Sequence, residues 1–139
     1  MGIFFKLFNG LHIFIYRLTG GRLGGAIGGA KVLLLTTKGR KSGKPHTNPL
    51  NYFERDGGYL IVASNGGQSR HPAWYHNVTA NPDVTIEIGA KTLQVHAEMV
   101  TDEAARAAAW EQVVQTAPSF RNYKKWTTRE IPLVMLKAA

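Results

Sequence analysis

The sequence contains no cysteine and is poor in acidic residues. Its 139 residues include 9 Asp and Glu against 17 Lys and Arg, so the formal net charge is +8. The lack of cysteine excludes disulfides, thiolate nucleophiles and thiolate metal sites, and it fits a reducing cytoplasm. The excess of positive charge favours an anionic partner such as nucleic acid, anionic lipid, or a ligand with phosphate or carboxylate groups.

Long apolar runs are missing as well. A membrane-spanning helix needs about 20 apolar residues, and the N-terminal segment is interrupted by Asn9, Gly10 and His12, which also argues against a secretory signal. Residues 3–18 instead predict an amphipathic helix. Its apolar stripe consists of Ile3, Phe4, Leu7, Phe8, Leu11, Phe14, Ile15 and Leu18. The stripe fits two interpretations: packing on the rest of the chain or a partner, or contact with a membrane surface through residues 1–18. We therefore expect a cytoplasmic location, with peripheral contact at the inner face of the cell membrane as its extension.

The remaining pattern predicts an α+β fold with a mostly antiparallel sheet or small barrel. We expect an N-terminal helix and a flexible Gly-rich connector within residues 1–30, followed by one domain at 31–139. Strands are predicted at 32–37, 47–55, 59–64, 84–88, 92–99 and 131–136, and helical segments at 72–81, 103–117 and 119–126. Tight hairpin turns and the lack of a long crossover before residue 92 argue against a parallel sheet.

Several familiar catalytic motifs are absent. The Gly-rich connector lacks the dinucleotide fingerprint, and Gly39–Lys44 fails the phosphate-loop pattern because Pro45 stands where Ser or Thr should bind magnesium. Ser64 is not in a nucleophile elbow. His71 and His76 are five residues apart, do not share a helix face and have no carboxylate cluster nearby. These absences argue against a nucleotide hydrolase, a serine hydrolase and a metal site.

What the sequence does contain is a set of cations, amides and aromatic rings. A basic turn at Gly39–Lys44 suits a phosphate or carboxylates, although solvated hairpin turns have similar compositions. Pro49 marks an edge or bulge at the start of the second strand. Trp74 and Asn77 share one face of a helix. Either Trp74 stacks on a planar ligand ring while Asn77 hydrogen-bonds to its polar edge, or Trp74 is a core residue and Asn77 caps the helix. Phe120, Tyr123 and Trp126 recur every three residues, as in a core stripe or an apolar lid.

Together these segments resemble the deazaflavin (F420)-dependent nitroreductase and quinone reductase family of actinobacteria. The motifs that carry the resemblance are Thr37–Gly43 (TKGRKSG), Asn48-Pro49-Leu50, Ser64-Asn65-Gly66-Gly67 and Pro72–Asn77. The resemblance extends from the Gly-rich run at 20–25 to Ile131-Pro132. It implies a split β-barrel of about six strands with flanking helices. It also implies coenzyme F420, with its deazaflavin ring, phosphate and oligoglutamate tail, and hydride transfer to a quinone or nitroaromatic acceptor.

The resemblance also implies where the coenzyme would lie. The anionic arm would be held by Arg40, Lys41 and Ser42. The ring would be lined by His46, Thr47, Asn48, Pro49, Leu50, Asn51, Val62, Ala63, Ser64 and Asn65. The phosphate and tail would be covered by Ala73, Trp74, Tyr75, His76 and Asn77. Tyr123 would close over the ring, and Tyr123 and Ser64 are the expected proton donors, with bulk water as the competitor. Relatives often have an aromatic residue in place of Asn51 and a Lys in place of Asn65.

Three other functions stay open at this point. The basic turn would also suit the phosphate of a flavin mononucleotide (FMN) in a related split-barrel oxidoreductase. A non-catalytic protein that binds or carries the coenzyme would show the same residues. A nucleic-acid-binding module is supported by charge alone, because the aromatic residues do not interleave with a basic sheet face. The sequence does not fix the oligomeric state, although a homodimer is compatible with the resemblance, since split-barrel relatives are often dimers.

Overall fold

The chain is described by a computed structural model. It covers residues 3–21, 26–27, 30–65, 68–127 and 129–139, with the backbone alone described at 3–9, 26–27, 30 and 124–126. The predicted stripe side chains before Gly10, the Gly-rich residues 22–25 and 28–29, residues 66–67 and the side chain of Trp126 lie outside the described residues.

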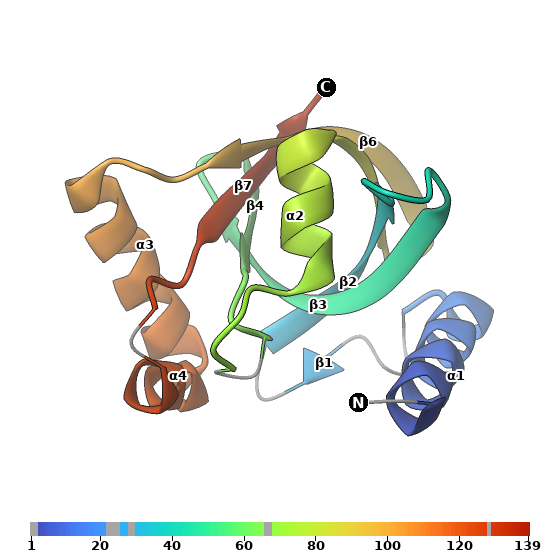
Figure 1. Cartoon of the computed structure of the whole chain (residues 1–139), viewed down its shortest axis with the longest axis horizontal. Coiled ribbons are helices and arrows are strands. Elements are labelled where there is room, and N and C mark those ends of the chain that lie inside the picture. The colour runs from blue at the N-terminus through green and yellow to red at the C-terminus, as the bar shows by residue number, and fades with distance from the viewer. Residues whose placement is uncertain (1–2, 22–25, 28–29, 66–67, 128) are drawn as a thin grey trace.

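An antiparallel sheet closes into a barrel. The strands run in the order β1-β2-β3-β4-β7-β6-β5, and a further pairing of β2 with β5 closes β2 to β7 into a ring (Figure 1). The strands are β1 (Ala26–Ile27), β2 (Ala30–Lys38), β3 (Pro45–Arg55), β4 (Gly58–Val62), β5 (Asp83–Ile88), β6 (Lys91–Met99) and β7 (Leu133–Ala138). The predicted antiparallel split barrel is confirmed. One of its tight hairpin turns is Asp56-Gly57, where both residues have positive φ.

Helices cover the barrel on several sides. They are α1 (Ile3–Thr19), α2 (Ala73–Ala80), α3 (Glu103–Thr116), the short η2 (Pro118–Phe120) and α4 (Arg121–Trp126). Figure 1 shows α2 across one opening of the barrel, with α1 on one side and α3 and α4 on the other. The predicted start of α3 is confirmed, because the Asp102 carboxylate accepts a hydrogen bond from the Ala105 N–H at 2.9 Å.

Strand β2 is apolar on both faces because both faces are covered. Leu33 and Leu35 point into the barrel core, whereas Val32 and Leu34 pack outward against α1. Side chains of a strand alternate between faces, so covering both faces removes the need for polar residues. This explains the nearly continuous apolar run that the sequence shows at 32–37.

Within the connector predicted to be flexible at residues 19–30, the structure describes the end of α1 and a short strand. Ala26 pairs with Lys31 and Ile27 with Ala30, so β1 adds a short strand to the edge of β2. A strand of two residues has no periodicity, which is why the pattern did not reveal it. Gly21 ends α1 with a φ of 83°, and a Cβ there would lie 2.9 Å from the Gly89 Cα. The glycine is therefore required by close backbone packing.

Helix α1 is held on the barrel by its last turns. Tyr16 is 1% exposed, and its hydroxyl donates to the Val32 carbonyl oxygen at 3.0 Å and accepts from the Gly89 N–H at 2.8 Å. Burial raises the pKa of Tyr16, which keeps this hydroxyl protonated. Arg17 adds an ion pair to Glu87 at 2.8 Å. The helix is thus anchored through the face opposite the predicted apolar stripe.

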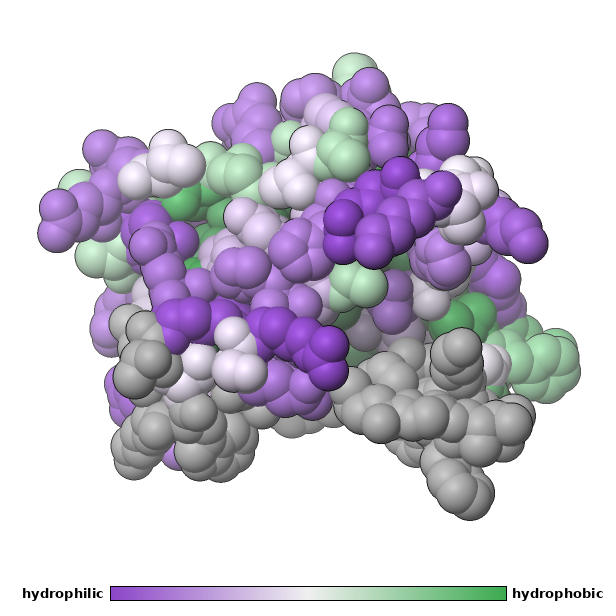
Figure 2. Space-filling view, viewed as in Figure 1, coloured by the Kyte–Doolittle hydropathy of each residue, from purple (hydrophilic) through white to green (hydrophobic). Residues whose placement is uncertain are grey.

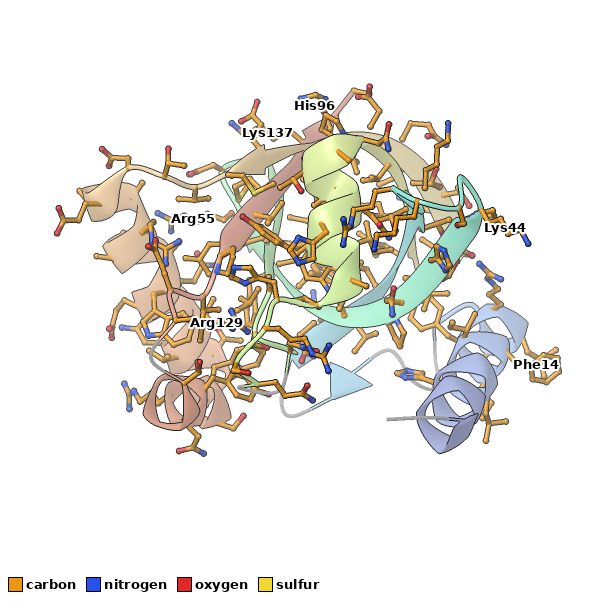
Figure 3. All side chains as sticks on the ribbon, in the orientation of Figure 1. Phe14, Lys44, Arg55, His96, Arg129 and Lys137 are labelled. Carbon is orange, nitrogen blue, oxygen red and sulfur yellow. The ribbon has the colours of Figure 1, made fainter. Side chains whose placement is uncertain are left out.

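Three of the four described members of the predicted apolar stripe face away from the barrel, and the fourth, Ile15, is half-buried. Leu11, Phe14 and Leu18 are 58%, 61% and 72% exposed. Figure 3 shows Phe14 pointing outward from α1. Packing of these residues on the barrel is therefore excluded, while a partner and a membrane surface are both compatible with their exposure. None of the helices that the structure describes is long and apolar enough to cross a membrane. The division of the chain at residue 30 stays a prediction.

Candidate functional site

A cavity of about 770 Å³ lies between α1, the β2–β3 turn, the start of β3 and α2. Its lining residues are Gly10, Ile13, Gly39, Arg40, Lys41, Ser42, His46, Thr47, Asn48, Ala73, Trp74 and Asn77. All of them except Gly10, Ile13 and Gly39 are residues that the family resemblance implied. The cavity therefore brings together the basic turn, the start of β3 and the first half of α2, which are separate in the sequence.

The β2–β3 turn is closed by its own hydrogen bonds. The Gly39 N–H donates to the Lys44 carbonyl oxygen at 2.8 Å, and the Gly43 N–H donates to the Gly39 carbonyl oxygen at 2.9 Å. The Ser42 Oγ accepts from the Lys44 N–H at 3.2 Å. A Cβ on Gly39 would lie 2.6 Å from that Oγ, so Gly39 allows the turn to fold tightly. Because these N–H groups are engaged, an anion bound here would depend on side chains more than the sequence suggested.

Asn77 joins this turn to α2. Its side chain is buried, and its Oδ1 accepts a hydrogen bond from the Arg40 N–H at 3.1 Å. Its Nδ2 donates to the Thr37 Oγ1 at 3.1 Å. The interpretation of Asn77 as a helix cap is therefore wrong: the side chain holds the β2–β3 turn instead. Leaving these buried groups without partners would cost about 1–3 kcal/mol each.

The turn carries cations without carboxylate partners. Arg40, Lys41 and Lys44 are exposed, and none of them takes part in the ion pairs found among the described residues. Strongly hydrophilic side chains gather over this turn in Figure 2, and Figure 3 shows Lys44 at its outer end. A polyanionic ligand in the cavity would therefore meet positive charge that no internal carboxylate neutralises.

Two residues of α1 complete the cavity wall. Gly10 and Ile13 line it from the side opposite α2, and sequence reasoning missed them because it considered a single apolar stripe. The available signal was the spacing of Ile13 and Tyr16, two largely apolar side chains three residues apart on the face opposite the stripe. Trp74 forms another part of the wall and is 5% exposed, within the barrel core cluster. Trp74 is thus a core residue that also borders the cavity.

The second half of the implied β3 site lies away from the cavity. Pro49, Leu50 and Asn51 pair in continuous register with β2 and are not among the lining residues. The interpretation of Pro49 as a bulge is wrong, since Leu34 and Pro49 are regular partners. The edge interpretation is confirmed, because β3 pairs with β4 only over Phe53–Arg55.

The side chains at the end of β4 and just after it are buried or half-buried. Val62 and Ala63 are buried in the two core clusters, and Ser64 and Asn65 follow. Asn65 has a φ of 48°, and its Nδ2 donates to the Arg70 carbonyl oxygen at 3.0 Å. Asn adopts this left-handed conformation more readily than most residues. This geometry accounts for an Asn at position 65.

Arg129 holds the segment that follows β4. Its Nη2 donates to the Ser64 carbonyl oxygen at 2.6 Å, and its Nε donates to the Gln68 carbonyl oxygen at 2.9 Å. Its Nη1 lies 3.0 Å from the His71 Nδ1. An arginine only donates, so the His71 Nδ1 is the acceptor and is unprotonated. Burial, together with the charges of Arg129 and His76, lowers the pKa of His71.

The remaining implied residues lie apart from the cavity. Tyr75 and His76 contact His71, with ring centroids 4.8 Å and 5.9 Å away. Tyr123 packs edge-on against Phe120 at 5.1 Å, beside the cluster between the barrel and α3. Among the described residues no group of His, Asp and Glu is arranged to hold a metal ion. The structure therefore gathers part of the implied site, and the roles of all the implied residues stay predictions.

Comparison with known proteins decides the family. The family described as F420H(2)-dependent quinone reductase matches residues 10–138. The chain belongs to this family. An F420H(2)-dependent quinone reductase of Mycobacterium tuberculosis is 46% identical over 129 residues, which cover 91% of this chain and 87% of that protein. The family assignment from the sequence is confirmed.

Solved structures of related proteins share the fold of this member of the F420H(2)-dependent quinone reductase family. The structure of an F420-H2 dependent reductase is 39% identical with a TM-score of 0.68, covering 76% of this chain and 93% of its own. Another structure, described as a domain-swapped dimer, is 35% identical with a TM-score of 0.72, covering 92% of this chain and 93% of its own. Both agree with the split barrel seen here.

The His71 contact predicts a pH dependence of stability. The folded pKa of His71 lies below its ordinary value near 6.5, so the unfolded chain binds more protons as the pH falls below about 6.5. This contribution to the free energy of unfolding is complete above about pH 6.5 and is lost as the pH falls towards the folded pKa. A His71→Asn variant retains an acceptor near the Nδ1 position but does not titrate. Urea unfolding between pH 7.5 and 5 should show a shallower loss of stability in His71→Asn. Equal slopes in the two proteins would show that His71 is not responsible.

Proposed function

We propose that this chain is an F420-dependent oxidoreductase that reduces a quinone, with its coenzyme held in the cavity beside the basic turn. The observation that carries the proposal is the combination of a 770 Å³ cavity with Arg40, Lys41 and Lys44, which have no carboxylate partner among the described residues. Family membership supports the identity of the coenzyme. A nitroaromatic compound is a second flat acceptor that the same chemistry would reduce.

The residues of the cavity fit such a coenzyme. Arg40, Lys41 and Ser42 would hold the phosphate and the glutamate carboxylates by charge-assisted hydrogen bonds, and Asn77 would keep their turn in place. Trp74 and Ile13 provide apolar walls that limit water. When bound, reduced F420 supplies a hydride, and the protein supplies orientation and a shaped site. The residues at 46–51, 62–65 and 73–77 that do not line this cavity, and Tyr123, are proposed to border the ring side.

The first experiment tests the basic turn. A triple Arg40→Gln, Lys41→Gln, Lys44→Gln variant should bind oxidised F420 roughly 3- to 100-fold more weakly, because each exposed charge contact contributes modestly. Fluorescence titration at low and high salt measures this, and the difference should shrink at high salt. FMN should bind weakly to both proteins.

The control removes the same charge elsewhere. Lys31, Lys91 and Lys137 are exposed and do not line the cavity. A variant with Gln at all three should keep its affinity for F420. An equal loss in the control would assign the effect to net charge, and tight FMN binding without F420 binding would favour a flavin enzyme. Binding of reduced F420 without oxidation by any quinone would favour a coenzyme carrier.

The second experiment concerns proton delivery to the reduced acceptor. Tyr123 and Ser64 are the proposed donors, because each side chain carries a hydroxyl group that can donate a proton. Tyr123→Phe keeps the ring that packs on Phe120, so its effect would report on the hydroxyl. If Tyr123 is the donor, kcat should fall about 100-fold while F420 affinity stays constant. The Ser64→Ala variant provides the comparison. Unchanged turnover in both variants would leave bulk water as the donor.

The third experiment tests peripheral membrane contact. We infer that the exposed stripe of α1 meets a lipid surface, where lipid-soluble quinones reside. Burying a Leu or Phe side chain contributes about 1.5–3 kcal/mol, so a Leu11→Gln, Phe14→Gln, Leu18→Gln variant should lose sedimentation with anionic liposomes. Deleting residues 1–18 is a poor test, because it also removes the buried Tyr16 and a cavity wall.

A control variant introduces the same residue, Gln, on another exposed surface. Ala104→Gln with Ala108→Gln on α3 should leave liposome binding unchanged, since both positions are exposed and belong to a different helix. If the stripe variant still sediments with liposomes, α1 contacts a protein partner or nothing at all.

The proposal includes a homodimer as the assembly. Its support is the relative of 35% identity whose structure is described as a domain-swapped dimer. The exposed stripe of α1 is one surface on which two copies would meet. Membrane contact and dimerisation through that stripe are therefore competing uses of the same side chains.

A further inference from the structure

We propose that Arg129 is a positioning residue for the reaction, because it binds the end of β4 and the residues before α2 and so fixes the place of Ser64 and Asn65. That Arg129 holds these residues does not depend on the proposed function, whereas its effect on turnover rests on that function. Arg129 belongs to the segment before β7, far in sequence from the residues it holds. Figure 3 shows it between that segment and the loop that leads to α2.

The contacts of Arg129 reach two described stretches of chain, 63–64 and 68–71. In the first stretch, its Nη2 donates to the Ser64 carbonyl oxygen at 2.6 Å and its Nη1 to the Ala63 carbonyl oxygen at 3.3 Å. In the second stretch, its Nε donates to the Gln68 carbonyl oxygen at 2.9 Å and its Nη1 to the His71 Nδ1 at 3.0 Å. One planar guanidinium thus fixes the distance between the end of β4 and the start of α2.

The environment of Arg129 is unusual for a side chain with a purely electrostatic role. The described residues offer it no carboxylate, and burial lowers the pKa of its guanidinium. A partly desolvated charge without an opposite charge is costly unless its donors are satisfied. Main-chain carbonyl oxygens and one imidazole satisfy them here. The fork geometry of arginine makes several such bonds at fixed angles, which lysine cannot reproduce.

The held segment carries residues proposed to act on the substrate. Ser64 is a proposed proton donor and Asn65 a proposed ring neighbour, and the Ser64 carbonyl forms the shortest of the Arg129 bonds. Asn65 in turn uses its Nδ2 to hold the Arg70 carbonyl oxygen at 3.0 Å. Displacing a positioned group by about 1 Å can reduce a rate by about 100-fold. Loss of the Arg129 guanidinium should therefore impair turnover more than it impairs binding of the anionic arm of F420 at Arg40 and Lys41.

The experiment compares wild type, Arg129→Lys and Arg129→Ala. We expect kcat with a soluble quinone to fall by about 10- to 100-fold, while the affinity for oxidised F420 measured by fluorescence changes by less than about 3-fold. Hydrogen–deuterium exchange of the protein without coenzyme should be about 10-fold faster at residues 63–71 and unchanged in β5 and β6. Millimolar guanidinium should restore part of the Arg129→Ala turnover, and should not act on wild type.

Arg106 supplies a matched control. Its guanidinium also binds the segment before β7, by donating to the Ile131 carbonyl oxygen at 2.9 Å and pairing with Glu130 at 3.0 Å. None of its hydrogen bonds among the described residues reaches the 63–71 segment. Arg106→Ala should therefore lower thermal stability without the faster exchange at 63–71 and without rescue by guanidinium.

Two results would overturn the proposal. The first is equal loss of turnover and equal exchange patterns in the Arg106 and Arg129 variants, which would indicate general destabilisation. The second is unchanged exchange and unchanged kcat in Arg129→Ala. If wild type fails to oxidise reduced F420 with any quinone, the proposed function fails instead. The exchange measurement then still decides whether Arg129 holds the segment.

Discussion

The pairing of β2 with β5 is the interaction on which the rest of the molecule depends. Leu34, Leu35 and Thr36 pair with Glu87, Ile86 and Thr85, and this pairing turns a sheet into a closed barrel. Closure leaves β2 with neighbours on both edges, and with the core on one face and α1 on the other. Tyr16 lies across this seam, because its hydroxyl contacts carbonyl oxygens of both Val32 in β2 and Glu87 in β5. The position of α1, and therefore of the cavity wall that it supplies, follows from the closed seam.

The cavity depends on one amide to join its two principal walls. Asn77 sits on α2, which covers the barrel opening, and it fixes the N–H of Arg40 at the tip of β2. The turn can then present cations outward while its own N–H groups donate to carbonyl and hydroxyl oxygens within the turn. A rigid turn places charge without a large entropic loss when a ligand binds. The order of the turn and its charge are thus separate properties supplied by different residues.

The sequence was most informative where residues had a periodic or conformational signature. The strands, the Asp56-Gly57 turn and the Asp102 cap were predictable because alternation, positive φ and capping chemistry are local. The two-residue β1 was not, because pairing partners leave no local pattern. The second apolar face of α1 was hidden by the stronger stripe at Leu11, Phe14 and Leu18. Arg129 gave no signal at all, since the carbonyl oxygens that it binds belong to every residue and only the fold brings them together.

The unpaired cations of the β2–β3 turn have a consequence for the stability of the whole chain. Arg40, Lys41 and Lys44 repel one another in the absence of an anion, so the folded state gains free energy when a polyanion arrives. A ligand that binds only the folded state adds about 2.7 kcal/mol at one hundred times its Kd. That is a large share of the 5–15 kcal/mol typical of a domain. For a polyanion that binds at this turn, the amount of folded protein in a cell is thereby linked to the supply of that ligand.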